Sequence, residues 1–179
     1  MQVKNFKNNT GASLIAIVIV LVVVISAFIG GWYLNYREKI KLEAKTRADL
    51  ENIKVAIIRL GQDTLYWPGN TKPYQVDSGA GIVFCTNKEV ACTNSLFSTS
   101  AGLTATDGSY LNWQGPYLRS AMLDPWSHEY FFETAFKLDS NFAACKISDD
   151  NCRPAIVIGS FGPNGVPHDF DDIILTLKI

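Results

Sequence analysis

The chain has 179 residues, 18% of them charged, and a formal net charge of -1 at pH 7. This length suits one domain of ordinary size with an appendage. A balanced charge lacks the basic footprint of nucleic-acid-binding proteins, which argues against nucleic acid as a partner.

An uncharged, apolar stretch lies near the N-terminus. No charged side chain occurs from Asn8 to Tyr36, and residues 12–34 are rich in Ile, Val and Leu. As a helix, this stretch extends about 35 Å, enough to cross a hydrocarbon core of about 30 Å. The alternative is a cleaved secretory signal, whose apolar region usually has only roughly 7–15 residues. The length therefore predicts a retained, single-pass transmembrane helix over residues 12–34.

The charges flanking this stretch give conflicting indications of its orientation. Lys4 and Lys7 precede it. Five basic residues follow it, namely Arg37, Lys39, Lys41, Lys45 and Arg47. A count of positive charge alone would leave the C-terminal part in the cytoplasm. Long C-terminal domains, however, translocate with little regard to flanking charge, and the cysteines favour an oxidising compartment, so we expect export.

The four cysteines form two pairs with the same spacing. Cys85 and Cys92 are seven positions apart, as are Cys145 and Cys152. Four cysteines allow three pairings, and bridges within each pair close the shortest loops, at about 2–3 kcal/mol each. Zinc sites usually have closer spacings, and reduced thiols are the remaining alternative. The pattern favours two local disulfides, which belong outside the cytoplasm.

The helical pattern continues beyond the apolar stretch. Residues 36–60 contain no Gly or Pro and are dense in Lys, Glu, Ala and Leu, which are good helix formers. We expect one helix over residues 12–60, ended by the stop signal of Gly61. Apolar positions at helical spacing predict a stripe that packs on a partner surface. The stripe consists of Ile40, Ala44, Ala48, Ile53, Ile57 and Leu60.

The residue pattern of 61–179 is typical of a small, β-containing head domain. Gly, Pro, Asn, Ser and Thr separate short apolar runs, and strands are predicted at residues 129–133, 155–158 and 173–179. A long helix followed by such runs predicts an α+β fold, in which a small, mainly antiparallel sheet packs on the second half of the helix.

Several motifs resemble those of type IV pilin-like proteins, and of type II secretion major pseudopilins in particular. A short basic leader ends in Gly11 directly before the apolar helix, and LGQDTLYWPGN at residues 60–70 follows the helix. The most specific match is GPYL at 115–118 with DPW at 124–126 and an aromatic strand behind it. The stretch GSFGPNGVPHDFDDI at 159–173 is similar to the family's terminal Gly- and Asp-rich loop.

This resemblance implies a structural subunit, not an enzyme, with a leader over residues 1–11 that a prepilin peptidase removes between Gly11 and Ala12. It implies a bacterial inner-membrane anchor with a periplasmic head. An assembly platform and its cytoplasmic ATPase would build the subunits into a pilus or pseudopilus filament, by stacking their helices with those of other pilin-like subunits. Ala12 stands where the family usually has a methylated Phe or Met, and Ala16 where it usually has Glu. Such departures occur in some minor subunits.

The resemblance also implies a Ca²⁺ site in the terminal loop. Calcium takes six to eight oxygen ligands, and the available side chains are Asn164, Asp169, Asp171 and Asp172. Gly162 and Gly165 would allow the tight turn. The alternative is a solvated acidic turn between two strands.

Two further function classes are alternatives to a structural subunit. None of the G-x-S-x-G, H-E-x-x-H or phosphate-loop motifs is present in the sequence, which argues against an anchored hydrolase. His128 and His168 are expected in a turn and a loop, and Trp67, Trp113 and Trp126 in packing. A membrane-anchored binding or adhesion module, which recognises a surface, a peptide or DNA during uptake, is the main alternative.

Overall fold

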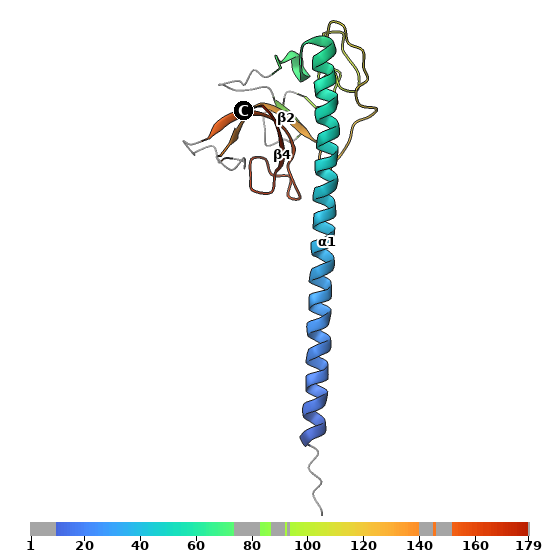
Figure 1. The fold of residues 1–179 in the computed structure, drawn as a ribbon, viewed down its shortest axis with the longest axis vertical. Coiled ribbons are helices and arrows are strands. Elements are labelled where there is room, and N and C mark those ends of the chain that lie inside the picture. Colours follow the sequence, from blue (N-terminus) through green and yellow to red (C-terminus); the bar gives the residue numbers. More distant parts are fainter. Residues whose placement is uncertain are drawn as a thin grey trace, which may run out of the picture. The chain divides into compact units, whose positions relative to one another are not determined.

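The computed structural model describes residues 10–73, 83–86, 92, 94–139, 145 and 152–178. The fold is α+β, as predicted, with a four-stranded antiparallel sheet in the order β1-β2-β3-β4 (Figure 1). The elements are α1 (Thr10–Thr64), the short 3-10 helix η1 (Pro68–Asn70), β1 (Val83–Phe84), β2 (Phe131–Leu138), β3 (Arg153–Ser160) and β4 (Ile173–Lys178). The chain divides into two compact units, residues 1–42 and 43–179.

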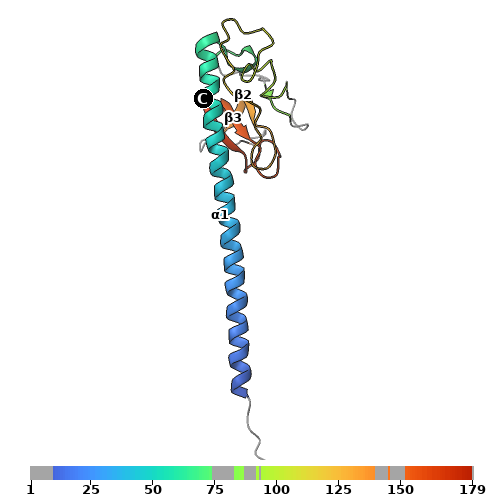
Figure 2. The ribbon, with the colours of Figure 1, turned by 90° about the vertical axis from the view of Figure 1, so that its right-hand side faces the viewer.

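Within the second unit, one face of α1 packs into the head. The buried positions on this face follow helical spacing and have almost no solvent exposure. They are Thr46, Leu50, Ile53, Ala56, Ile57, Leu60 and Thr64. They join side chains of β2 and β3 in one core, and Figure 2 shows these strands beside the C-terminal part of α1.

The predicted apolar stripe is therefore only half correct. Ile53, Ile57 and Leu60 are buried, but Ile40, Ala44 and Ala48 are exposed. An α-helix has about 3.6 residues per turn, so each step of four residues rotates the side chain by about 40° around the axis. A line drawn from Ile40 in such steps therefore leaves the face that contains Ile53 and Ile57. Thr46 and Leu50, which the predicted stripe omitted, lie on the buried face instead.

The end of α1 also differs from the prediction. Gly61 lies inside the helix, which continues to Thr64. A Cβ at position 61 would lie 2.8 Å from the Trp67 ring, so glycine here permits close packing and does not stop the helix. Leu65, the residue after the helix, terminates it with a left-handed φ of 68°, and the Leu65 amide donates to the Gly61 carbonyl at 3.0 Å. A leucine in this conformation gives no sequence signal.

The sheet is apolar on both faces. Phe132, Ile156 and Ile158 point towards α1, whereas Phe131 and Val157 point to the other face. We call the second group the outer cluster, which also contains Cys85, Phe136, Leu138, Ala155 and Phe161. A register shift between Glu133 and Phe136 places Phe136 on the same face as Phe131, and their rings stack at 5.9 Å. The strand predicted at 129–133 begins two residues before β2 and ends before it does, whereas the strand predicted at 155–158 lies within the longer β3.

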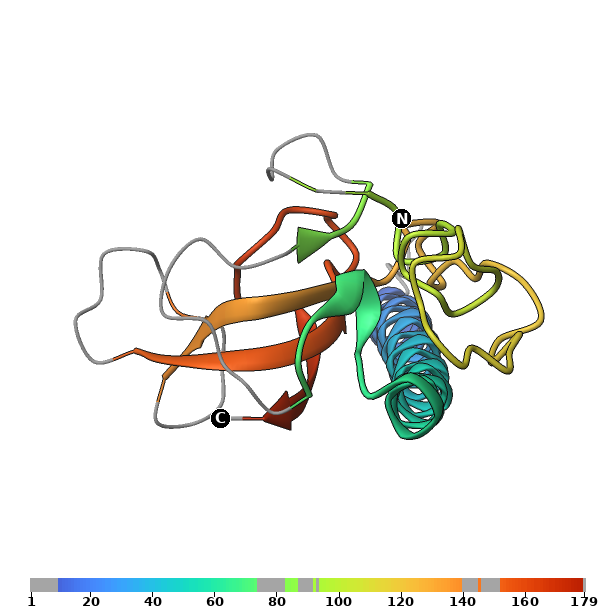
Figure 3. The same cartoon turned by 90° about the horizontal axis from the view of Figure 1, so that it is seen from above.

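The connection between β1 and β2 completes the core around α1. In Figure 3 the strands lie on one side of α1 and most of this connection on the other. Its buried members in this core are Leu96, Phe97, Ala101, Leu103, Tyr110 and Tyr130. Both predicted disulfides are formed, Cys85 with Cys92 and Cys145 with Cys152.

The two halves of the predicted stripe can be compared by substitution of the same residue type. Ile57→Ala removes a fully buried side chain and should lower the free energy of unfolding by about 2–5 kcal/mol. Ile40→Ala removes a side chain that is 47% exposed and should change it by less than about 0.5 kcal/mol. Chemical unfolding of the full chain in detergent, followed by tryptophan fluorescence, measures both. Equal losses would contradict the packing of α1.

Candidate functional site

The N-terminal half of α1 is the first candidate functional surface. Every side chain from residue 16 to residue 41 is exposed, including the Ile, Val and Leu residues of 17–25. Among the described residues this is the one helix long and apolar enough to cross a membrane, and its most apolar window is not buried at all. An exposed apolar area of this size needs a non-aqueous partner. The helix therefore indicates a membrane anchor or a signal sequence, and the disulfides indicate a head outside the cytoplasm.

The predicted cleavage position lies at the start of this helix. Gly11 and Ala12 belong to the first turn of α1 by their backbone conformation. Residues 1–9 of the leader are outside the described part of the chain.

The motif after the helix and the GPYL motif meet at the end of α1. The Tyr117 hydroxyl donates to Asp63 at 2.8 Å and accepts the Gln114 amide. Trp67 is buried against Gly61, and the Trp113 indole donates to the Gly102 carbonyl at 2.7 Å. These aromatic residues are packing groups, as the sequence predicts, and they hold the β1–β2 connection against the helix.

The DPW motif forms a turn around one buried carboxylate. Asp124 accepts hydrogen bonds from the Trp126 and His128 amides at 3.0 and 2.8 Å, and from the Ser160 hydroxyl at 2.5 Å. Ser160 in turn accepts the Gly162 amide. Because Ser160 is the last residue of β3, the Asp124 carboxylate connects this turn to the start of the terminal loop. His128 is in a turn, as predicted, and its Nδ1 lies 3.1 Å from the Gly162 carbonyl.

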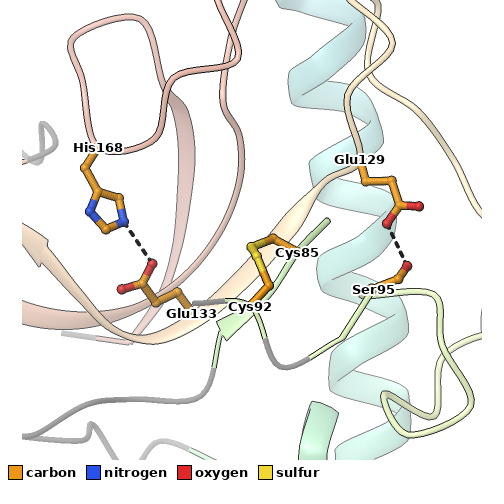
Figure 4. Close-up of a disulfide and its surroundings, with 6 residues drawn as sticks. All are labelled: Cys85, Cys92, Ser95, Glu129, Glu133 and His168. Carbon is orange, nitrogen blue, oxygen red and sulfur yellow. Dashed lines mark hydrogen bonds and ion pairs between the residues drawn. A yellow bond between two sulfur atoms is a disulfide. The ribbon is translucent and has the colours of Figure 1, made fainter. Parts of the chain in front are cut away.

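The terminal loop, residues 161–172, folds back over the outer face of the sheet. Its first residue, Phe161, stacks on Phe131 at 4.4 Å. His168 packs edge-on against Phe136 at 5.0 Å, and its Nε2 lies 3.2 Å from the Glu133 carboxylate (Figure 4). This hydrogen bond raises the pKa of His168 above its usual value. The sequence does not predict this contact. Glu133 is a polar residue in an apolar strand, and His168, which is distant in the sequence, reaches it only when the terminal loop folds back.

The four predicted calcium ligands separate into two groups. The Asn164 amide nitrogen donates to Asp169 Oδ2 at 2.7 Å and to Asp171 Oδ1 at 2.8 Å, so these three side chains converge. Asp172 is turned inwards, where Oδ2 accepts the His168 amide and Oδ1 is buried with no hydrogen-bond partner. Within the described residues, no three His, Cys, Asp or Glu side chains form a metal-binding group.

Two carboxyl groups of the loop have raised pKa values. Burial raises the pKa of Asp172 to about 7, and burial together with the neighbouring Asp169 carboxylate raises the pKa of Asp171.

Gly162 and Gly165 have positive φ values of 65° and 67°, which confirms the predicted tight turn.

Comparison of the chain with protein-family models, with curated proteins and with solved structures gives no significant match. The class of the protein therefore depends on its own architecture. A long N-terminal apolar helix whose C-terminal part packs on a four-stranded antiparallel sheet is a pilin-like architecture.

Proposed function

We propose that the chain is a structural subunit of a type IV pilus or a type II secretion pseudopilus, anchored in the bacterial inner membrane with its head in the periplasm. The observation that carries this proposal is the division of α1. Residues 16–41 of this helix are exposed and mostly apolar, whereas its C-terminal part is the central element of a disulfide-containing head. The motif residues support it, because GPYL and DPW are the residues that attach the loops of the head to the helix and to β3.

The apolar half of α1 would serve both storage and assembly. In the bilayer, the backbone N–H and C=O groups of the helix are paired with one another. Lipid chains are as apolar as a neighbouring helix, so close packing, and not the hydrophobic effect, drives two such helices together. Gly30 and Gly31 have no atom near the position of an added Cβ, which leaves room for close approach by another helix. Removal of such a helix from lipid is costly unless other apolar helices replace the lipid. Partner subunits, an assembly platform and its ATPase would supply that replacement and the work.

The role of a minor subunit is favoured over that of a bulk subunit. Ala16 is exposed and carries no charge. A Glu in the apolar half of a helix costs roughly 2.5–3.5 kcal/mol in lipid unless it is paired, so it draws a subunit towards a partner that neutralises it. Because Ala16 has no charge to neutralise, the chain would enter a filament by apolar packing alone.

Two alternatives have less support. A binding or adhesion module would use exposed apolar residues on the head, of which Phe170, 95% exposed in the terminal loop, is the clearest. A hydrolase would need a serine that donates to a histidine. Ser160 is buried and donates to Asp124 instead, although His128 is nearby.

Processing of the leader distinguishes the pilin-like role from the alternatives. In cells with an active prepilin peptidase, mass spectrometry should find a mature chain that begins at Ala12. Gly11→Val should prevent cleavage, because the enzyme would require a small residue before the bond that it cuts. The matched control is Gly31→Val, in the same helix and in open space, which should be processed normally. An intact Met1 in the unmodified chain, or cleavage after residue 34, would contradict the proposal.

Calcium binding at the terminal loop is proposed as a property of this subunit. Rotation of the Asn164 amide by half a turn would exchange its nitrogen for its oxygen and break the hydrogen bond that this oxygen accepts from the Val166 amide. It would place three oxygens around one point, from Asn164, Asp169 and Asp171. Backbone carbonyls and water would complete the shell. Asp172 is not expected to be a direct ligand because it is turned inwards. The ion would tie the loop together by neutralising its carboxylates.

Thermal unfolding of the full chain in detergent tests this proposal. Saturating Ca²⁺, relative to a chelator, should raise the melting temperature by about 5–10 °C at 100 times the Kd. Asp171→Asn should abolish the shift. Asp107→Asn changes a fully exposed carboxylate in another loop and should leave the shift unchanged. An absence of any shift in millimolar Ca²⁺ would refute the site.

A further inference from the structure

Exposed aromatic and basic residues lie where the apolar half of α1 ends. Trp32, Tyr33 and Tyr36 are 76%, 55% and 57% exposed, and they are followed by Arg37 and Lys41, which are exposed as well. We call these five residues the collar. Trp and Tyr concentrate at the depth where a bilayer changes from hydrocarbon to headgroups, so the collar marks the depth of α1 in a membrane.

The side chains of the collar are arranged along one side of the helix. Tyr33, Arg37 and Lys41 are four residues apart, and the Arg37 guanidinium lies over the Tyr33 ring at 5.8 Å. Trp32 and Tyr36 are also four apart and their rings stack, with centroids separated by 6.4 Å. These contacts orient the guanidinium beside the aromatic rings and leave its N–H groups available to an oxygen-rich ligand.

The dimensions place the basic groups in the headgroup layer. At 1.5 Å per residue, Arg37 lies about 6 Å and Lys41 about 12 Å beyond Tyr33 along the axis. The polar layer on each side of a bilayer is about 5–8 Å thick, and the flexible stem of a lysine can bring its ammonium group back towards that layer. Both cations can therefore reach phosphate groups when Tyr33 is at the hydrocarbon boundary.

Two of the basic residues in this flank, Arg37 and Lys41, take part in none of the ion pairs of the described residues. Lys45, in contrast, is bound to Asp49 at 2.6 Å. The basic residues from position 37 to position 47 outnumber the acidic ones, Glu38 and Glu43. If the head is exported, this surplus opposes the usual rule that positive charge faces the cytoplasm. A ligand that requires positive charge on the exported side would account for it.

On the basis of the membrane anchoring proposed above, we infer that the collar binds the phosphate headgroups of anionic phospholipids in the leaflet on the side of the head. A guanidinium forms paired, charge-assisted hydrogen bonds with phosphate oxygens, and the aromatic rings contact the adjoining glycerol and upper acyl region. The collar thereby holds the helix at one depth and enriches anionic lipid around it.

Quenching of Trp32 by brominated lipids tests this inference on the full chain. Two samples of phosphatidylcholine vesicles are compared. One contains a small fraction of brominated phosphatidylglycerol, and the other contains the same fraction of brominated phosphatidylcholine. Each basic residue should enrich the anionic lipid near Trp32 by about fivefold at low salt, and high salt should reduce the effect. Trp32→Phe gives the background from Trp67, Trp113 and Trp126, which lie in the head.

A double variant and a matched control distinguish the outcomes. Arg37→Gln with Lys41→Gln should quench equally with both lipids, whereas Lys54→Gln with Arg59→Gln, on the head half of the same helix, should keep the preference. Equal quenching of the unmodified chain by both lipids would overturn the collar and leave the anchor intact. An absence of quenching by either lipid would instead overturn the membrane anchoring itself.

Discussion

The head depends on the packing of one face of α1 between the sheet and the β1–β2 connection. Leu50, Ile53 and Ile57 fill the space between these layers and have almost no exposure. Each of these side chains contributes roughly 1.5–3 kcal/mol when it is fully buried. Two tyrosine hydroxyls fix the helix at either end of this contact, Tyr130 with Asp49 and Tyr117 with Asp63, both at 2.8 Å. Burial raises the pKa of Tyr130, which therefore stays a donor to the Asp49 carboxylate.

The same helix has no core in its N-terminal half. The side chains of residues 16–41 are exposed, and a helix is one of the few structures that can satisfy its backbone in lipid. In the proposed role, α1 would have two kinds of partner, protein in the head and lipid or other apolar helices along its N-terminal half. The collar lies where these environments change, and it would keep the helix at a fixed depth until assembly. Loss of anionic lipid contacts would then be part of the cost of leaving the membrane.

The sequence predicts the features that depend on composition and local spacing. The apolar helix, both disulfides, three strands and the tight turn of the terminal loop follow from such signals. Features that depend on contacts between distant residues were missed or misplaced. Gly61 looks like a helix stop, and only its distance to the Trp67 ring explains its presence inside α1. The outer cluster could not be predicted because Phe131 and Phe161 meet only after the terminal loop returns to the sheet.

The candidate site illustrates the same limit. The resemblance to pseudopilins singles out the loop that contains Asn164, Asp169 and Asp171, and these three side chains do converge. The inward turn of Asp172 and the link from Asp124 to Ser160 depend on tertiary packing, and no periodicity or spacing indicates them. The family resemblance singles out DPW, but only the structure shows that its aspartate is a buried carboxylate around which the turn forms.

The proposed role requires the apolar half of α1 to leave lipid and pack against the helices of other subunits. The most direct measurement places a photo-crosslinking residue at Val24, a position that is exposed in the isolated chain, in cells whose assembly machinery is active. Filaments sheared from these cells should contain covalent adducts between this helix and the apolar helix of another pilin-like subunit. Adducts with lipid alone, while the machinery assembles filaments in the same cells, would contradict the account.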